Sequence, residues 1–251
     1  MQYIHPSARI GKDVKIGMFT VIHEDVEIGD GCVIGSNVVI HPGTKIGSFV
    51  RIEDGTVIGK MPMRSPRSAV KPGTEVSSSD LAPAYIGDGC LIGAGTVIYR
   101  GCHISSRVLI ADLVTIRERA TIGEETIIGR GVAVENYCRI GKRCKLETNA
   151  YITAYSELED DVFIAPGVVT SNDNFAGRGK ERFKYFKGVT VKRGGRIGAQ
   201  ATILPGKVIE EEGFVGAGSV VTHDVKARKI YFGNPAREIR DVPEEQLLEN
   251  Q

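Results

Sequence analysis

A branched aliphatic residue occupies every sixth position through most of the 251-residue chain. Isoleucine keeps this spacing from Ile4 to Ile58, and aliphatic residues keep it again from Ile86 to Ile164 and from Val191 to Val221. Of the 27 isoleucines, 24 lie on this repeat. A short fixed period indicates a repeat architecture, in which each unit packs mainly against its neighbours.

The other positions of the hexapeptide indicate short strands. The residue four places after each aliphatic is usually small or β-branched, as at Ala8, Val14 and Thr20, and it faces the same side of a strand as the next aliphatic. Six residues are too few for a strand and a hairpin, so the strands must bend at corners and wind as a coil. With 26 Val against 9 Leu and no Trp, the composition also favours strands over helices.

This pattern resembles the hexapeptide-repeat family. The resemblance implies an all-β fold, a left-handed parallel β-helix with three hexapeptides per triangular coil, and about ten coils for thirty repeats. It also implies a homotrimer with ligand clefts between subunits. We expect a β-helix domain over residues 1–232 and a tail over 233–251 that ends in a short capping helix from Pro243 to Gln251.

Charge and cysteine usage narrow the class of protein. A formal net charge of +1 argues against a nucleic-acid or anionic-membrane partner bound through bulk charge. No apolar run is long enough to span a membrane, and the first residues lack a secretory signal, so a cytoplasmic location is expected. All five cysteines occupy the small inward position without metal-ligand spacing, which predicts buried free thiols. They are Cys32, Cys90, Cys102, Cys138 and Cys144.

Two segments interrupt the repeat and should form outward loops, at about residues 60–85 and 171–190. The first carries Lys60, Arg64, Arg67 and Lys71 before any acidic residue. The second contains four of the sixteen aromatic residues and begins a stretch with seven basic side chains and no acidic one. Each loop is either a clamp for phosphate groups or a solvated surface loop.

Residues 18 apart should lie above one another on successive coils. Arg117 then stacks on Glu135, and Arg119 precedes Tyr137 and Tyr155 in another column. These side chains form either a structural ion pair or a substrate-binding wall, with arginines for phosphate or carboxylate and tyrosines for a sugar or base.

The C-terminal coils resemble those of hexapeptide acyltransferases that bind acetyl-coenzyme A. The similar segments are the run from Val191 to Gly198, the GAGSVVTHDV run, and the Gly233-Asn234-Pro235-Ala236 turn. The resemblance implies acetyl-CoA as the acyl donor. The residues it places beside the coenzyme are Lys192, Arg193, Gly194, Ala199, Ala217, Gly233, Asn234, Pro235 and Arg237.

The run from Cys138 to Asp173 is similar to nucleotide-sugar N-acetyltransferases, and most similar to those acting on 3-amino sugars. Some relatives have a basic histidine where this chain has Asn136, and there is no histidine between His103 and His223. We therefore expect direct attack of a neutral amine on the thioester. The candidate proton acceptors are Glu135, Glu147 and Asp173, and the candidate orienting amides are Asn136 and Asn149.

Other functions remain open at this point. An O-acetyltransferase would need a strong base for a hydroxyl acceptor. A metal-dependent hydratase would need a site such as the column His5, His23 and His41, although no metal is expected. A noncatalytic scaffold would bind no coenzyme, and carrier-protein-dependent relatives usually have a larger helical C-terminal region.

Overall fold

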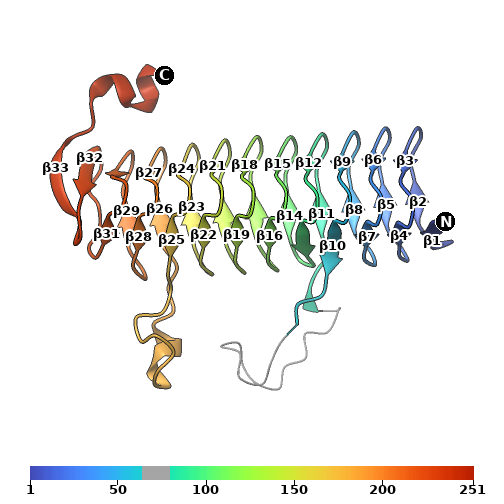
Figure 1. The fold of residues 1–251 in the computed structure, drawn as a ribbon, viewed down its shortest axis with the longest axis horizontal. Coiled ribbons are helices and arrows are strands. Elements are labelled where there is room, and N and C mark those ends of the chain that lie inside the picture. Colours follow the sequence, from blue (N-terminus) through green and yellow to red (C-terminus); the bar gives the residue numbers. More distant parts are fainter. Residues whose placement is uncertain (64–79) are drawn as a thin grey trace.

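The computed structural model describes residues 1–63 and 80–251. The hexapeptides wind into a left-handed parallel β-helix, a triangular prism with a sheet on each of its three sides (Figure 1). Along each sheet the neighbours are every third strand, so hydrogen-bonded partners are one coil apart, except at the C-terminal end of the third sheet. The all-β fold expected from the sequence is confirmed.

The three sheets are named in the order in which the chain visits them. The first sheet contains 11 strands, β1 (Tyr3–Ile4), β4 (Val21–Ile22), β7 (Val39–Ile40), β10 (Val57–Lys60), β13 (Val97–Tyr99), β16 (Thr115–Ile116), β19 (Ala133–Val134), β22 (Tyr151–Ile152), β25 (Val169–Thr170), β28 (Thr202–Ile203) and β31 (Val220–Val221). The second contains 10 strands, β2 (Arg9–Ile10), β5 (Glu27–Ile28), β8 (Lys45–Ile46), β11 (Tyr85–Ile86), β14 (His103–Ile104), β17 (Thr121–Ile122), β20 (Arg139–Ile140), β23 (Glu157–Leu158), β26 (Thr190–Val191) and β29 (Val208–Ile209). The third contains 12 strands, β3 (Lys15–Ile16), β6 (Val33–Ile34), β9 (Arg51–Ile52), β12 (Leu91–Ile92), β15 (Leu109–Ile110), β18 (Ile127–Ile128), β21 (Lys145–Leu146), β24 (Phe163–Ile164), β27 (Arg196–Ile197), β30 (Phe214–Val215), β32 (Lys229–Phe232) and β33 (Arg237–Asp241).

The helix is slightly longer than the expected ten coils because three of these strands, β25, β32 and β33, lie outside the six-residue aliphatic pattern. In β25 a threonine takes the inward position. The Thr170 hydroxyl accepts a hydrogen bond from the Thr153 backbone N–H at 2.8 Å and donates one to the Tyr151 carbonyl at 3.0 Å. A polar side chain can therefore replace the aliphatic one here because its hydrogen bonds are made.

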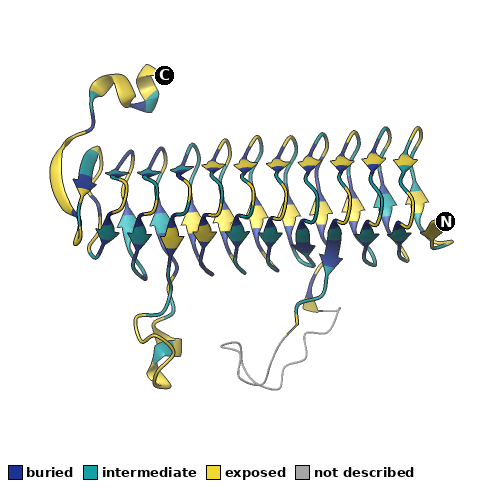
Figure 2. Ribbon diagram, viewed as in Figure 1, coloured by how far each residue is buried: buried dark blue, intermediate teal, exposed yellow. Residues whose placement is uncertain are grey.

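The interior is a continuous column of the repeat residues (Figure 2). Every isoleucine of the repeat from Ile22 to Ile58 is buried, whereas Ile4, Ile10 and Ile16 are partly or largely exposed because no coil covers the N-terminal end. Burial of one isoleucine stabilises the fold by roughly 1.5–3 kcal/mol, so each coil contributes through contacts with the next. The five cysteines are free and buried, as the sequence predicts.

The chain turns at three corners, and only one of them carries the excursions. The first corner joins the first sheet to the second, the second corner joins the second sheet to the third, and the third corner joins the third sheet to the first. Both excursions leave at the first corner, one between β10 and β11 and the other between β25 and β26 (Figure 1). The second excursion contains the 3-10 helix η2 (Glu181–Lys184).

The C-terminal tail differs from the expected capping helix. After the turn at residues 233–236, β33 pairs antiparallel with β32 and extends the third sheet past the last coil. Two 3-10 helices follow, η3 (Glu244–Gln246) and η4 (Leu248–Asn250). They fold back over the second corner, where the Leu248 backbone N–H donates to Glu212 at 3.0 Å. Within residues 1–63 and 80–251, no helix is long and apolar enough to cross a membrane.

Candidate functional site

Four successive turns of the first corner lie between the two excursions, and they bring together most of the predicted substrate-binding residues. The stacking expected from the 18-residue spacing is present. The Tyr137 and Tyr155 rings are stacked with centroids 5.2 Å apart, and the guanidinium of Arg119 lies 5.4 Å from the Tyr137 ring centre. Arg117 lies over the Tyr99 ring at 4.9 Å.

The backbone explains why three of these side chains project together. Arg119, Tyr137 and Tyr155 all occupy the turn position with positive φ, at 62°, 61° and 65°. This left-handed conformation is unfavourable for bulky residues and usually holds glycine or asparagine. Large residues also take this conformation at successive turns of the second corner, such as Arg107, Glu125 and Arg143, so it is a general feature of the coil turns that here directs three side chains the same way.

An arginine with two carboxylates forms the charged centre of the corner. Arg117 Nε lies 2.9 Å from Glu118 Oε2, and its Nη2 lies 3.3 Å from Glu118 Oε1. Its Nη1 lies 3.6 Å from Glu135 Oε2. Glu118 is 2% exposed, so the two-point contact with Arg117 compensates for burial of its charge. The stacked pair Arg117 and Glu135 predicted from the sequence is present, but Glu118 holds the shorter contacts.

Glu135 lines a hollow of about 170 Å³, which we call the inner pocket. Its lining residues are Glu135, Asn136, Tyr151, Thr153, Ala154, Tyr155, Asn172 and Phe186. Desolvation raises the pKa of Glu135 above its ordinary value, Arg117 opposes this change, and the like charge of Glu118 reinforces it. Desolvation, together with the nearby charge of Glu135, also raises the pKa of Tyr151. A partly desolvated carboxylate with a raised pKa is suited to accept a proton near neutral pH.

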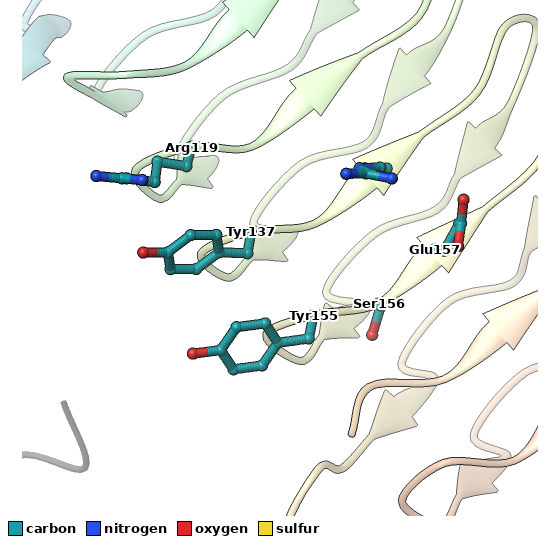
Figure 3. Close-up of a pocket in the computed structure, with 6 residues that line it drawn as sticks. Arg119, Tyr137, Tyr155, Ser156 and Glu157 are labelled. Carbon is teal, nitrogen blue, oxygen red and sulfur yellow. The ribbon is translucent and has the colours of Figure 1, made fainter. Parts of the chain in front are cut away.

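A second hollow, of about 300 Å³, lies on the other side of Tyr155, and we call it the outer pocket. It is lined by Arg119, Tyr137, Arg139, Tyr155, Ser156 and Glu157. Figure 3 shows Arg119, Tyr137 and Tyr155 projecting side by side from successive coils, with Ser156 and Glu157 following Tyr155 along the chain. The two pockets therefore share one aromatic wall at the same corner.

The second excursion closes one side of the inner pocket through Asn172 and Phe186. Its fold depends on Asp173, whose carboxylate accepts the backbone N–H groups of Phe175 and Gly177 and pairs with Arg182 at 2.8 Å. Although desolvation acts in the opposite direction, these hydrogen bonds and the Arg182 charge lower the pKa of Asp173. This predicted proton acceptor is thus a weak base already engaged in holding the loop.

The first excursion returns to the same corner. Arg100 donates to the Leu81 carbonyl at 2.9 Å and to the Pro42 carbonyl at 2.7 Å, and Arg119 donates to the Asp80 carbonyl at 2.9 Å. Lys60 lies 5.0 Å from the Tyr99 ring centre. Arg64, Arg67 and Lys71, the other members of the predicted phosphate clamp, lie outside the described residues.

The remaining predicted residues lie at the other two corners. Asn149 and Glu147 are at the third corner, where Glu147 pairs with Lys145 at 3.1 Å. Ala199, Ala217, Gly233, Asn234, Pro235 and Arg237 are also at or next to this corner. Lys192, Arg193 and Gly194 are at the second corner, where Lys192 pairs with Glu159 at 2.8 Å and Leu248 of the tail lies against Gly194. One chain therefore does not bring all the predicted coenzyme residues together.

The histidine column does not form a metal centre. His23 and His41 are stacked with ring centres 5.5 Å apart, while His5 Nδ1 lies 2.9 Å from the Ser7 hydroxyl. Among residues 1–63 and 80–251, no three His, Cys, Asp or Glu side chains are grouped closely enough to hold a metal ion.

Several site residues were not predicted from the sequence. Glu118 directly follows Arg117 at a turn, where a charged side chain is expected to be exposed, but the structure buries it. Phe186 and Asn172 come from the second excursion, whose path no repeat fixes. Tyr151, Arg139 and Glu157 occupy outward strand positions, and only the 18-residue stacking could have placed them beside the corner.

Comparison with protein families agrees with this architecture. The model described as "Bacterial transferase hexapeptide (six repeats)" matches residues 7–42, and "Hexapeptide repeat of succinyl-transferase" matches 25–60, 83–111 and 114–154. These matches identify hexapeptide repeats over residues 7–60, 83–111 and 114–154 of the chain.

Hexapeptide-repeat proteins of known activity resemble separate parts of this chain. The bifunctional protein GlmU of Shouchella clausii is 27% identical over 168 residues, which cover 61% of this chain and 35% of that protein. The dTDP-3-amino-3,6-dideoxy-alpha-D-galactopyranose 3-N-acetyltransferase of Aneurinibacillus thermoaerophilus is 51% identical over 47 residues, which cover 19% of this chain and 24% of that enzyme. The chain thus spans about a third or less of these curated relatives.

A solved structure extends the similarity of fold to nearly the whole chain. The Arabidopsis UDP-N-acetylglucosamine acyltransferase superposes with a TM-score of 0.63 and 20% identity, covering 99% of this chain and 75% of that one. At this identity the likeness concerns the β-helix alone.

Proposed function

We propose that this hexapeptide-repeat protein is an acetyl-CoA-dependent N-acetyltransferase that acylates the amino group of a nucleotide-linked amino sugar, in particular a 3-amino sugar. The observation that carries the proposal is the inner pocket, where Glu135 with its raised pKa and Asn136 meet two tyrosines beneath the second excursion. Similarity to the 3-N-acetyltransferase over 47 residues supports the choice of acceptor.

The chemistry assigns the roles within this pocket. The neutral amine attacks the thioester carbonyl, a C–N bond forms, and the C–S bond breaks. The proton lost by the amine passes through Glu135 to the departing thiolate, so the coenzyme leaves as its thiol. Glu135 accepts the proton that the amine loses, because Asp173 is held by Arg182 and Glu147 is paired at another corner. Asn136 orients the amine, and positioning supplies much of the rate acceleration.

Small residues near the C-terminus are compatible with the acetyl-CoA donor. Ala217 and Gly218 are exposed at the third corner, and no atom lies within 4 Å of a Cβ built on Gly218. Such a surface leaves room for the narrow pantetheine arm of a coenzyme, while the exposed Arg237 supplies a cation for its phosphates. When bound, acetyl-CoA supplies the activated acetyl group.

A homotrimer is part of this proposal because the residues lie at different corners of one chain. The outer face of the third sheet carries exposed Val33, Leu91, Leu109 and Ile127, and that of the first sheet carries partly exposed valines. The second sheet instead presents charged residues such as Arg9, Glu27 and Lys45. Packing the first sheet of one copy against the third sheet of the next closes a ring by threefold rotation.

In this arrangement the third corners of the three subunits, with Asn149 and Arg237, would gather around the threefold axis. The cleft between two subunits would run from there to the first corner of one subunit and the second corner of its neighbour. We accordingly assign Asn149 to the acceptor cleft, and Ala199, Ala217 and the residues around Gly233 to the coenzyme. We keep Lys192, Arg193 and Gly194 as coenzyme contacts made at the second corner. Five free thiols are compatible with a reducing cytoplasm as the location.

An O-acetyltransferase is less well supported. The five histidines are His5, His23, His41, His103 and His223, and none of them lines either pocket. A carboxylate of modestly raised pKa can take the proton from an amine after attack, but it is a poor base for a sugar hydroxyl.

The experiment that tests the proposal measures thiol release from acetyl-CoA in the presence of amino-sugar nucleotides, followed by mass spectrometry of the product. We expect a gain of one acetyl group that resists hydroxylamine, as an amide does. A hydroxylamine-labile ester would favour the O-acetyltransferase, and no thiol release with any amino-sugar nucleotide would contradict the proposal.

A further inference from the structure

The outer pocket has a composition that the acetyl-transfer step does not require. It contains two stacked tyrosines, two arginines, a serine and a glutamate, of which Arg139 and Glu157 belong to the second sheet. Its volume of about 300 Å³ is in the range of small-ligand sites. If this hollow has a function, it should bind a part of the substrate other than the reacting amino sugar.

Arg139 and Glu157 are oppositely charged neighbours in this pocket that do not pair with each other. Arg139 in β20 and Glu157 in β23 occupy directly opposed positions on neighbouring parallel strands. No ion pair or side-chain hydrogen bond joins either residue to another in the two described ranges, 1–63 and 80–251. Elsewhere on the same sheet, the equivalent pair Arg9 and Glu27 is joined by a salt bridge. Arg139 and Glu157 therefore line the pocket side by side as a cation and an anion that no salt bridge joins.

The aromatic wall suits a planar ring. The Tyr137 and Tyr155 rings are inclined by 16° to each other and are 38% and 46% exposed. The two rings stack on each other and Arg119 lies over Tyr137 on the side away from Tyr155, so a base in the pocket meets the exposed ring edges and hydroxyl groups, in edge-to-face contact (Figure 3). Their positive φ values fix both side chains at the tip of the turn, as Figure 3 shows.

We propose that the outer pocket binds the nucleoside diphosphate half of the substrate, with the base against Tyr137 and Tyr155, the diphosphate on Arg139 and a pentose hydroxyl on Glu157. The proposal rests on the proposed function for the identity of the whole substrate. Guanidinium groups bind phosphate by paired hydrogen bonds, and carboxylates accept hydrogen bonds from ribose hydroxyls in nucleotide sites.

The position of the pocket fits this assignment. Tyr155 forms a wall of both pockets, so a nucleotide sugar that wraps around it places its sugar beside Glu135 and Asn136. The outer pocket opens toward the charged second sheet, which stays free of the interface in the proposed trimer. A nucleotide can therefore enter and leave without subunit dissociation.

Calorimetric titration of the intact protein with UDP, dTDP and GDP, without acetyl-CoA or sugar, tests the proposal. We expect at least one of these probes to bind saturably. Loss of the aromatic contact in Tyr137→Ala should raise its dissociation constant about threefold or more, and loss of the charge in Arg139→Gln should raise it about tenfold or more. Glu157→Gln should weaken binding severalfold.

Two matched variants control for the change in surface chemistry. Phe49 is an exposed aromatic at a turn position with φ 58°, and Arg9 is an arginine on the same sheet as Arg139. Phe49→Ala and Arg9→Gln should leave the dissociation constant unchanged, and melting curves report whether each variant is folded. Absence of binding for all three probes, or equal binding by wild type, Tyr137→Ala and Arg139→Gln, would overturn the proposal.

The test separates this proposal from the proposed function. If nucleotide binding falls in the variants while no amino-sugar nucleotide supports thiol release, the pocket assignment stands and the acetyltransferase fails. If thiol release occurs and its KM for the acceptor is the same in Tyr137→Ala and Arg139→Gln, the acetyltransferase stands and the pocket assignment fails.

Discussion

Replacing Glu118 by glutamine should lower the pKa of Glu135 and shift the pH dependence of acetyl transfer to lower pH. Glu118 holds Arg117 at 2.9 Å and 3.3 Å, whereas Arg117 lies 3.6 Å from Glu135. The variant removes a like charge that raises the pKa of Glu135, and it frees Arg117 to turn toward Glu135. Both effects favour the ionised carboxylate.

The size of the shift follows from these contacts. A neighbouring charge within about 4–6 Å changes a carboxyl pKa by roughly 1–3 units. The side chains of Arg117 and Glu135 are 26% and 24% exposed, so solvent screening places the change near the lower end, at about one pH unit. We also expect a loss of about 1–2 kcal/mol in the free energy of unfolding, because the hydrogen bonds of Arg117 to a charged partner weaken.

The assay is the pH profile of kcat/KM with an amino acceptor. If transfer needs a neutral amine and an ionised Glu135, lowering the pH reduces log kcat/KM with a slope of one below the pKa of the amine. A second break, to a slope of two, follows below the pKa of Glu135. Glu118→Gln should move the second break down by about one unit, and Glu135→Gln should abolish it. Glu53, a partly exposed residue at the third corner, provides a control, Glu53→Gln. A break that stays in place or moves upward in Glu118→Gln would refute the reasoning.

Three further predictions concern stability, thiol chemistry and the third corner. Asp161→Asn should lower the free energy of unfolding at pH 7 by about 0.5–1 kcal/mol, because hydrogen bonds from Arg143 at 2.7 and 3.0 Å lower the pKa of Asp161. A carboxyl whose pKa is lower in the folded than in the unfolded state, where it is near 3.9, stabilises the fold at pH values above that unfolded pKa. The difference in unfolding free energy between wild type and Asp161→Asn should therefore disappear as acid protonates Asp161 in the folded protein. A difference that stays constant with pH in chemical unfolding would contradict this. Burial raises the pKa of Cys102 and Cys138 to about 12, so a thiol reagent should titrate none of the five cysteines until the protein is unfolded, and rapid labelling of the native state would show the reading of the core to be wrong. Asn149→Gly keeps the positive φ of 59° and removes the amide, so it should lower kcat while leaving the dissociation constant for acetyl-CoA unchanged; full turnover would remove Asn149 from the mechanism.

Much of the fold could be predicted because its interactions are local and periodic. The isoleucine spacing determined which residues face inward, and the 18-residue coil placed Arg119, Tyr137 and Tyr155 in one column. The strand β25 was not predicted because its inward residue, Thr170, makes hydrogen bonds in place of an aliphatic contact. The structure of the tail was not predicted because β33 pairs antiparallel with β32, and the six-residue repeat predicts only the parallel strands of the coils.

The site was less predictable because it depends on the directions in which turn side chains point and on segments outside the repeat. Spacing placed Arg117 above Glu135 but could not show that Glu118, its chain neighbour, turns inward and takes the two-point contact. Resemblance assigned Asn149 and Lys192 to clefts between subunits, and within one chain they lie at different corners, so the geometry of a single chain does not test whether they share a site. Asp173 has the chemistry of a base, but the loop that positions it also uses its carboxylate.

Titration calorimetry of the purified protein with acetyl-CoA tests the proposed acyl donor without knowledge of the acceptor sugar. We expect saturable binding close to one coenzyme per chain, weakened in Arg237→Ala. Absence of binding by a folded, trimeric protein would contradict the acetyl-CoA-dependent function and favour a carrier-protein donor or a noncatalytic scaffold.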